Sequence, residues 1–246
     1  MINIGKVISI STVDWNGRSS HVIFFNGCPL RCHYCQNYKL LDCTRFIEID
    51  KIKKGILDAK MFISAVVFSG GESTMQPDAL LELTKFIKEQ GLLVGIQTSG
   101  YFPDILRELA EKKLVDKIFL DIKADPLEPM RYNEITNAKD AYIVSRVIQT
   151  LHIPDMDIEV RTTIFRSLND SFEIAKYLEE HNYNGTYVIQ QGVPWYASSD
   201  KKIRKEDMLT RKEMISIAKN IDTNIGLKGI KIRTIEKGEE HIIRYK

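Results

Sequence analysis

The sequence predicts an α/β fold in which a mostly parallel sheet curls into an incomplete barrel of six strand–helix units. Short stretches rich in Val, Ile and Phe recur along the chain, and helical patterns separate them. Nearly continuous hydrophobicity is typical of parallel strands that are buried on both faces. Strands that alternate with helices indicate βαβ units, whose right-handed crossovers curl a sheet toward a barrel. Because a closed barrel of this kind has eight units, six units predict an incomplete one.

The elements follow from apolar runs, helical periodicity and punctuating residues. A proline at the expected first turn and a glycine just past the end favour a helix between Pro77 and Gly91. Side chains of residues 169–171 supply caps for a later helix. The predicted strands are residues 21–26, 64–69, 92–98, 117–122, 157–164 and 186–190. The predicted helices are residues 77–90, 103–113, 139–151, 171–181 and 210–220.

The end of the chain follows a different pattern. Residues 228–246 alternate polar and apolar side chains, which predicts one or two strands and a hairpin that turns near Lys237 and Gly238. We therefore expect residues 1–225 to form the partial barrel. Residues 226–246 are expected to form a C-terminal β extension of the same domain, which covers the open edge of the barrel or contacts a partner.

Length, charge and hydropathy narrow the function classes. The chain has 246 residues, enough for one domain with a sizeable core, and a net charge of +2 from 35 basic and 33 acidic residues. This balance gives no overall attraction to nucleic acid or to an acidic membrane. The N-terminus lacks a signal-peptide pattern, and no apolar run is long enough to span a bilayer. We expect a cytoplasmic protein without a membrane partner.

All four cysteines lie between Cys28 and Cys43, which indicates metal binding rather than a disulfide framework. Cys28, Cys32 and Cys35 have the spacing C-x3-C-x2-C in a loop that directly follows the first predicted strand. A [4Fe–4S] cluster normally takes four thiolates, so three would leave one iron open for a small ligand. Two alternatives remain: a zinc site completed by Cys43 or His33, and an electron-transfer cluster in which Cys43 is the fourth ligand.

Polar residues follow the other strands, where barrels of this type carry their chemistry. Gly70, Gly71 and Glu72 come after the second strand, and paired glycines let a backbone approach a ligand closely. Thr98 and Ser99 follow the third strand and are small hydroxyl residues suited to a ligand-facing turn. Turns without a ligand are the alternative in both places.

Charged pairs and amides mark the remaining strands. Alternation puts Asp121 and Lys123 on one face of the fourth strand. Glu159 and Arg161 share a face of the fifth strand in the same way, and Gln190 lies at the end of the sixth. Opposite charges in apolar strands are costly to bury unless they are paired or bind a ligand. Each pair is therefore either a ligand contact or a structural salt bridge.

Cys28, Cys32 and Cys35, with the aromatic Tyr34 before the third cysteine, resemble the signature of radical S-adenosylmethionine (SAM) enzymes. The resemblance implies a [4Fe–4S] cluster whose open iron is chelated by SAM. The reduced cluster then cleaves SAM to a 5′-deoxyadenosyl radical.

The resemblance also assigns roles to the residues at the other strand ends. It makes Gly70, Gly71 and Glu72 a loop that contacts the SAM amino group, with Ser73 in the place of the usual proline. The other residues expected to bind the cofactors are Tyr34, Thr98, Ser99, Asp121, Lys123 and Arg161. Gln190 is added because an amide at the mouth of the barrel could contact the adenine or ribose. The resemblance makes the three cysteines and Lys123 the candidate catalytic residues.

Residues 11–17 and 187–191 resemble one subgroup, the activating proteins of anaerobic ribonucleoside-triphosphate reductases. The chain is compact and has no second cysteine cluster. The resemblance then implies an oxidoreductase that abstracts a glycine Cα hydrogen from a partner glycyl radical enzyme. Ferredoxin or flavodoxin would be the electron donor. The alternative is a radical SAM enzyme that modifies a small molecule or tRNA, such as a deazaguanine-pathway synthase. The basic residues 201–212 are either an RNA contact or a solvated helix start.

Overall fold

The structure, a computed structural model, describes residues 1–197 and 203–242. Its internal contacts divide the chain into two compact units. The first unit comprises Met1–Pro29, Asn37–Phe119 and Arg146–Asp157, and the second comprises Leu30–Gln36, Leu120–Ser145 and Ile158–Lys246. Strand β6 (Lys117–Asp121) and helix α5 (Ile143–Leu151) contribute residues to both units.

The first unit is built on strands in the order β5-β4-β2-β1-β3. Strand β2 pairs in parallel with β4, and β4 pairs in parallel with β5, whereas β1 runs antiparallel to both of its neighbours. The strands are β1 (Ile2–Ser11), β2 (Ser20–Phe25), β3 (Phe46–Ile47), β4 (Ala65–Gly70) and β5 (Leu93–Thr98). Strands β2 and β4 are buried on both faces, as continuous apolar patterns predict.

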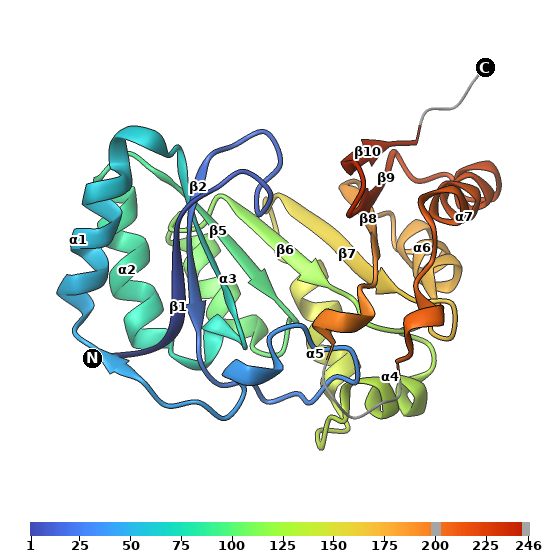
Figure 1. Ribbon diagram of the computed structural model, residues 1–246, viewed down its shortest axis with the longest axis horizontal. Helices are drawn as coiled ribbons and strands as arrows, with labels where there is room; N and C mark the ends of the chain where they lie inside the picture. The colour runs from blue at the N-terminus through green and yellow to red at the C-terminus, as the bar shows by residue number, and fades with distance from the viewer. Residues whose placement is uncertain (198–202, 243–246) are drawn as a thin grey trace. The chain divides into compact units, whose positions relative to one another are not determined.

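Helices α1 (Ile49–Ala59), α2 (Pro77–Glu89) and α3 (Pro103–Glu111) belong to the first unit. Figure 1 shows α1 and α2 side by side, and both contact strands of the sheet. Helix α1 buries Ile52, Ile56 and Ala59, which share one face because they are three or four residues apart. Proline starts both α2 and α3, where its missing N–H leaves no helical hydrogen bond unmade.

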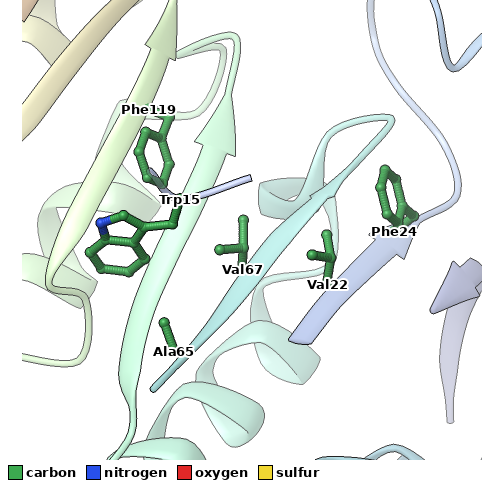
Figure 2. Close-up of a cluster of buried hydrophobic side chains, with 6 residues drawn as sticks. All are labelled: Trp15, Val22, Phe24, Ala65, Val67 and Phe119. Atoms are coloured by element: carbon green, nitrogen blue, oxygen red, sulfur yellow. The ribbon is translucent and has the colours of Figure 1, made fainter. Parts of the chain in front are cut away.

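An apolar cluster fills one face of this sheet (Figure 2). Trp15, from the loop between β1 and β2, packs edge-on against Phe119 with 5.5 Å between the ring centroids. A Cβ on Gly95 would lie 3.0 Å from both rings, so any larger residue would push the two side chains aside. The buried members of the cluster are Trp15, Val22, Phe24, Ala65, Val67 and Phe119.

The second unit carries strands in the order β10-β9-β8-β7. Strand β8 is parallel to both β7 and β9, and β10 folds back antiparallel to β9. The strands are β7 (Ile158–Ile164), β8 (Thr186–Gln191), β9 (Gly229–Thr234) and β10 (Gly238–His241). The helices of this unit are α4 (Pro129–Thr136), α6 (Ser171–Glu180) and α7 (Arg211–Asn224). Helix α7 contacts β8 and β9, and Figure 1 shows it beside them.

The six predicted strands correspond to β2 and β4 to β8, with ends that differ by one residue at most. The predicted helices correspond to α2, α3, α5, α6 and α7, and the C-terminal hairpin is β9 and β10. Residues 243–246 of the predicted extension lie outside the described residues. No helix within residues 1–197 and 203–242 is long and apolar enough to cross a membrane.

Candidate active site

The glycine loop after β4 packs its backbone against the start of the cysteine loop, within the first unit. Gly71 N–H donates to the carbonyl of Phe25 at 2.9 Å, and Glu72 N–H donates to the carbonyl of Gly27 at 2.8 Å. A Cβ on Gly71 would lie 2.0 Å from the Gly27 carbonyl oxygen and 3.3 Å from Cβ of Cys28. Gly71 is therefore required for the close approach of these two backbones.

Glu72 is a buried carboxylate that joins the end of β4 to the end of β5. Its Oε1 accepts hydrogen bonds from the hydroxyls of Thr74 (2.6 Å) and Thr98 (2.9 Å). Its Oε2 accepts from the backbone N–H (2.9 Å) and the hydroxyl (2.7 Å) of Ser99. With a longer contact from Thr74 N–H at 3.4 Å, five donors surround a group with about four lone-pair sites. The structure thus brings Glu72, Thr98 and Ser99 together.

Ser73 follows Glu72, and its buried hydroxyl has no hydrogen-bond partner in the described part of the chain. It opens a 3-10 turn, η3 (Ser73–Met75), and none of the described hydrogen bonds uses its backbone N–H. The preceding residue, Glu72, has φ −137° and ψ 109°. This extended conformation is the one that a following proline favours.

We therefore expect Ser73→Pro to stabilise the protein by about 0.5–1 kcal/mol. Proline removes an unsatisfied buried hydroxyl, restricts the unfolded chain and costs no native N–H hydrogen bond. Chemical denaturation of the ligand-free protein measures the change in the free energy of unfolding. Ser73→Ala separates the two contributions, because it removes only the hydroxyl. A lower stability of the proline variant than of the alanine variant would contradict this expectation.

The remainder of the cysteine loop belongs to the second unit and is anchored to the end of α4. Arg31 N–H donates to the carbonyl of Thr136 at 2.8 Å, and His33 N–H donates to that of Ile135 at 3.1 Å. Cys35 N–H closes a turn onto the carbonyl of Cys32 at 3.1 Å. These bonds hold the Cys32–Cys35 turn on a helix end without using either thiol.

None of the four cysteines forms a disulfide. Cys43 is exposed, and its thiol donates to the carbonyl of Lys39 at 2.7 Å. Among the described residues, no three His, Cys, Asp or Glu side chains converge on one point as the ligands of a single metal ion do. The thiolates of a [4Fe–4S] cluster bind different iron atoms, so they need not converge in that way.

Asp121 and Lys123 lie close together, as alternation along β6 predicts, with 3.6 Å between Oδ2 and Nζ. Burial works against the charge of Lys123, but Asp121 and other neighbours hold the pKa of the ammonium well above its usual value. Burial raises the pKa of the Cys32 thiol to about 11, and the nearby charge of Lys123 opposes that rise. Asp121 and Lys123 thus form a salt bridge, and the positive charge of Lys123 also favours the thiolate form of Cys32.

Tyr34 is buried, and its ring packs at a tilt against Phe165 with 5.7 Å between the centroids. Burial also raises the pKa of its hydroxyl well above the usual value. Tyr34, the aromatic residue of the cysteine motif, therefore forms an apolar contact with Phe165 beside the cysteine turn.

Arg161 and Glu159 form a buried ion pair on β7, with 2.8 Å between Nε and Oε1. Burial, and next the charge of Arg233, lower the pKa of the Arg161 guanidinium. On β8, Gln190 donates from Nε2 to the hydroxyl of Thr163 at 3.3 Å. Of the two alternatives for each charged pair, the salt bridge is observed for Asp121 with Lys123 and for Glu159 with Arg161. Contact of these residues with a ligand stays a prediction.

Three charged residues on the sheet face that carries Glu159, Arg161 and Gln190 were not predicted from the sequence. They are Lys231 and Arg233 of β9 and Glu239 of β10, and they form an ion-pair network beside Glu159 and Gln190. Hydrogen bonds from Lys231 and Arg233 lower the pKa of the Glu239 carboxyl to about 2 although its burial works against this. The signal was present, since two basic residues at alternate positions of a strand share one face.

Comparisons with known proteins show which family the chain resembles. The model of the radical SAM superfamily matches residues 22–189. A Methanocaldococcus jannaschii protein, provisionally named a glycyl-radical enzyme activating enzyme, is 29% identical over 235 residues, which cover 92% of this chain and 96% of its own length. The pyruvate formate-lyase-activating enzyme of Clostridium pasteurianum is 36% identical over 129 residues, 50% of this chain and 53% of that protein.

Among solved structures, TYW1 with a lysine–pyruvate adduct bound superposes with a TM-score of 0.62 at 18% identity. The match covers 92% of this chain and 80% of that one. At this identity the likeness shows the fold alone. It agrees with the α/β fold and mostly parallel sheet that the strand pattern predicted.

Proposed function

The chain belongs to the radical SAM superfamily, and we propose that it activates a glycyl radical enzyme by removing a hydrogen atom from a glycine Cα of that partner. The observation that supports this most strongly is the match to the M. jannaschii relative, which spans nearly the whole of both chains. Enzymes of this family use a [4Fe–4S] cluster and SAM. The residues at the strand ends have the chemistry that these two groups require.

The donor set suits the cluster. Cys28, Cys32 and Cys35 offer three thiols that are not consumed by disulfides, and thiolates are the ligands of such clusters. When bound and reduced, by ferredoxin or flavodoxin, the cluster supplies the electron that splits SAM into methionine and a 5′-deoxyadenosyl radical. The lack of a Cβ on Gly71 leaves room for the Gly27–Cys28 backbone beside it.

The residues proposed to hold the two charged groups of SAM are acceptors for its amino group and a cation for its carboxylate. Because protein donors fill the lone pairs of Glu72, the loop can accept from the SAM amino group with its backbone carbonyls. These are the carbonyl of Gly71 and that of Gly70, which accepts from Nδ2 of Asn37 at 2.9 Å and has a second lone pair. Ser99 and Thr98 complete that polar edge. Arg161, whose fork suits a carboxylate, serves the acidic end of SAM.

The remaining roles concern the nucleoside and the cluster. Asp121 and Lys123 serve the ribose and the neighbouring carboxylate, and Gln190 serves the adenine or ribose. Tyr34 shields the cysteine turn from water, because its ring is buried against Phe165.

We propose an anaerobic ribonucleotide reductase as the partner, on the resemblance of residues 11–17 and 187–191 to its activating proteins. The basic segment 201–212, in contrast, gives little support for an RNA substrate. Residues 201 and 202 lie outside the described residues, and Arg211 pairs with Glu240 at 2.5 Å.

The test is electron paramagnetic resonance of anaerobically reconstituted protein mixed with SAM, a reductant and the anaerobic ribonucleotide reductase of the same organism. We expect a doublet from a carbon-centred radical on the partner. It should disappear in Cys28→Ser, Cys32→Ser and Cys35→Ser and persist in the matched control Cys43→Ser. Loss of the cluster in the control would instead favour a four-cysteine site.

A reduced-cluster signal that changes with SAM, without a radical on this reductase or on another glycyl radical enzyme, would overturn the activase proposal. Deoxyadenosine formed only with a small molecule or tRNA would then identify the alternative substrate class. Absence of any iron–sulfur signal would overturn the proposed cofactor itself.

A further inference from the structure

The C-terminal hairpin shares a sheet face with the side chains proposed to bind SAM. In the register of the second unit, Arg161 of β7 pairs with Val188 of β8, and Gln190 of β8 pairs with Arg233 of β9. Glu239 of β10 lies opposite Arg233. Neighbours in register point to the same side, so the hairpin adds its charged residues to the face that carries Arg161 and Gln190.

Arg233 is the residue of the hairpin that touches this face. Its Nη1 donates to Oε1 of Gln190 at 3.0 Å, and its Nη2 lies 2.6 Å from Oε2 of Glu239. The same Nη2 lies 3.9 Å from Oε1 of Glu159, the atom that accepts from Arg161. One guanidinium therefore contacts groups on three other strands.

The contact with Gln190 fixes the orientation of an amide. An amide side chain has a donor end and an acceptor end, which are interchanged by a half-turn. Arg233 can only donate, so it requires the carbonyl end of Gln190 to face it. The NH2 end then faces Thr163, and the polarity that Gln190 presents to a ligand is set by a residue 43 positions away in sequence.

The contact with Glu159 affects the charge of Arg161. Glu159 is shared between two guanidiniums, and Glu239 is shared between Arg233 and Lys231. The ion pairs join three cations (Arg161, Lys231, Arg233) to two carboxylates (Glu159, Glu239), and the carboxylate of Asp121 also acts on Arg161. A carboxylate that is shared in this way neutralises Arg161 less than one that serves Arg161 alone, so Arg161 keeps more attraction for an anion.

We propose that Arg233 is a positioning residue for SAM: it orients Gln190 and shares Glu159, and thereby prepares Arg161 to take the SAM carboxylate. This inference rests on the proposed function. It gives the C-terminal hairpin a task in the reaction beyond extending the sheet from β8. Glu239 supports the task, because it holds Arg233 from the opposite side at 2.6 Å.

The test measures SAM binding to the reconstituted, oxidised protein by isothermal titration calorimetry, in which no turnover occurs. We expect Arg233→Leu to weaken binding of SAM at least tenfold. Lys231→Met is the matched control: it removes the same charge from the same face of the same strand, but Lys231 contacts Glu239 and neither Glu159 nor Gln190. We expect it to change the dissociation constant less than twofold.

Arg233→Lys is a conservative second variant, for use if Arg233→Leu does not fold. Lysine keeps the positive charge, but it cannot bond two acceptors at once as the planar guanidinium does. We expect a three- to fivefold loss of affinity from it, and in steady-state cleavage a rise in KM for SAM with little change in kcat. Equal affinities for Arg233→Leu and Lys231→Met would overturn the positioning role. Failure of the wild-type protein to bind SAM would instead overturn the proposed function, so the two failures are distinguishable.

Discussion

Gly71→Ala is expected to destabilise the ligand-free protein by about 3 kcal/mol or more and to prevent iron incorporation. The new methyl group would lie 2.0 Å from the carbonyl oxygen and 2.7 Å from the carbonyl carbon of Gly27. These are backbone atoms held by the Glu72 N–H hydrogen bond, so they cannot swing aside as the end of a flexible side chain does. Overpacking of this kind costs about 1–3 kcal/mol when side chains can adjust, and more when they cannot.

The measurements are chemical denaturation of the ligand-free protein and iron content after anaerobic reconstitution. The matched control is Gly55→Ala, also in the first unit, where the nearest atom to the new Cβ is 4.0 Å away on His21. Because Gly55 lies within α1, alanine there should stabilise the protein by up to about 1 kcal/mol. Normal iron content in Gly71→Ala would show that the glycine loop does not position Cys28.

The strands were predictable because burial on both faces requires a nearly continuous run of apolar residues. Strands β4 and β8 bury most of their residues on both faces, and such strands are apolar almost throughout. Strand β1 escaped prediction because most of its residues are partly or fully exposed. Helix α1 was missed although Ile52, Ile56 and Ala59 recur at helical spacing, so a systematic search for that period would have found it.

The site was predictable at the level of residue types and only partly at the level of contacts. Spacing put Asp121 near Lys123 and Glu159 near Arg161, since a period of two keeps alternate residues on one face. The partners of Glu72 could not be foreseen, because Ser99 is 27 residues away and reaches it only when β4 and β5 pair. Arg233 is further removed still, and only the register of β8 against β9 reveals its contact with Gln190.

Glu72→Gln is expected to lower the free energy of unfolding by about 2–4 kcal/mol and to weaken SAM binding. Both carboxylate oxygens accept hydrogen bonds, and each faces a backbone N–H: Oε1 that of Thr74 at 3.4 Å and Oε2 that of Ser99 at 2.9 Å. A backbone N–H can only donate, whereas a hydroxyl can reverse its role. Whichever way the new amide turns, its NH2 group therefore meets a donor with which it cannot bond.

The size of the effect follows from burial. Glu72 is 1% exposed, so water cannot take the place of a lost partner. An unsatisfied buried donor costs about 1–3 kcal/mol, and the charge-assisted bonds of the carboxylate are lost as well. Because Thr98 and Ser99 are held by these bonds, both should shift, and the polar edge at the end of β5 would lose its geometry.

Denaturation of the ligand-free variant and calorimetric titration of SAM into the reconstituted variant measure the two effects separately. Glu82→Gln is the control, since Glu82 is an exposed partner of Lys53 and makes the same chemical change at the surface. That variant should lose no more than about 0.5 kcal/mol and bind SAM normally. Wild-type stability in Glu72→Gln would mean that its oxygens are not held by these donors, and the carboxylate would then be available to contact SAM directly.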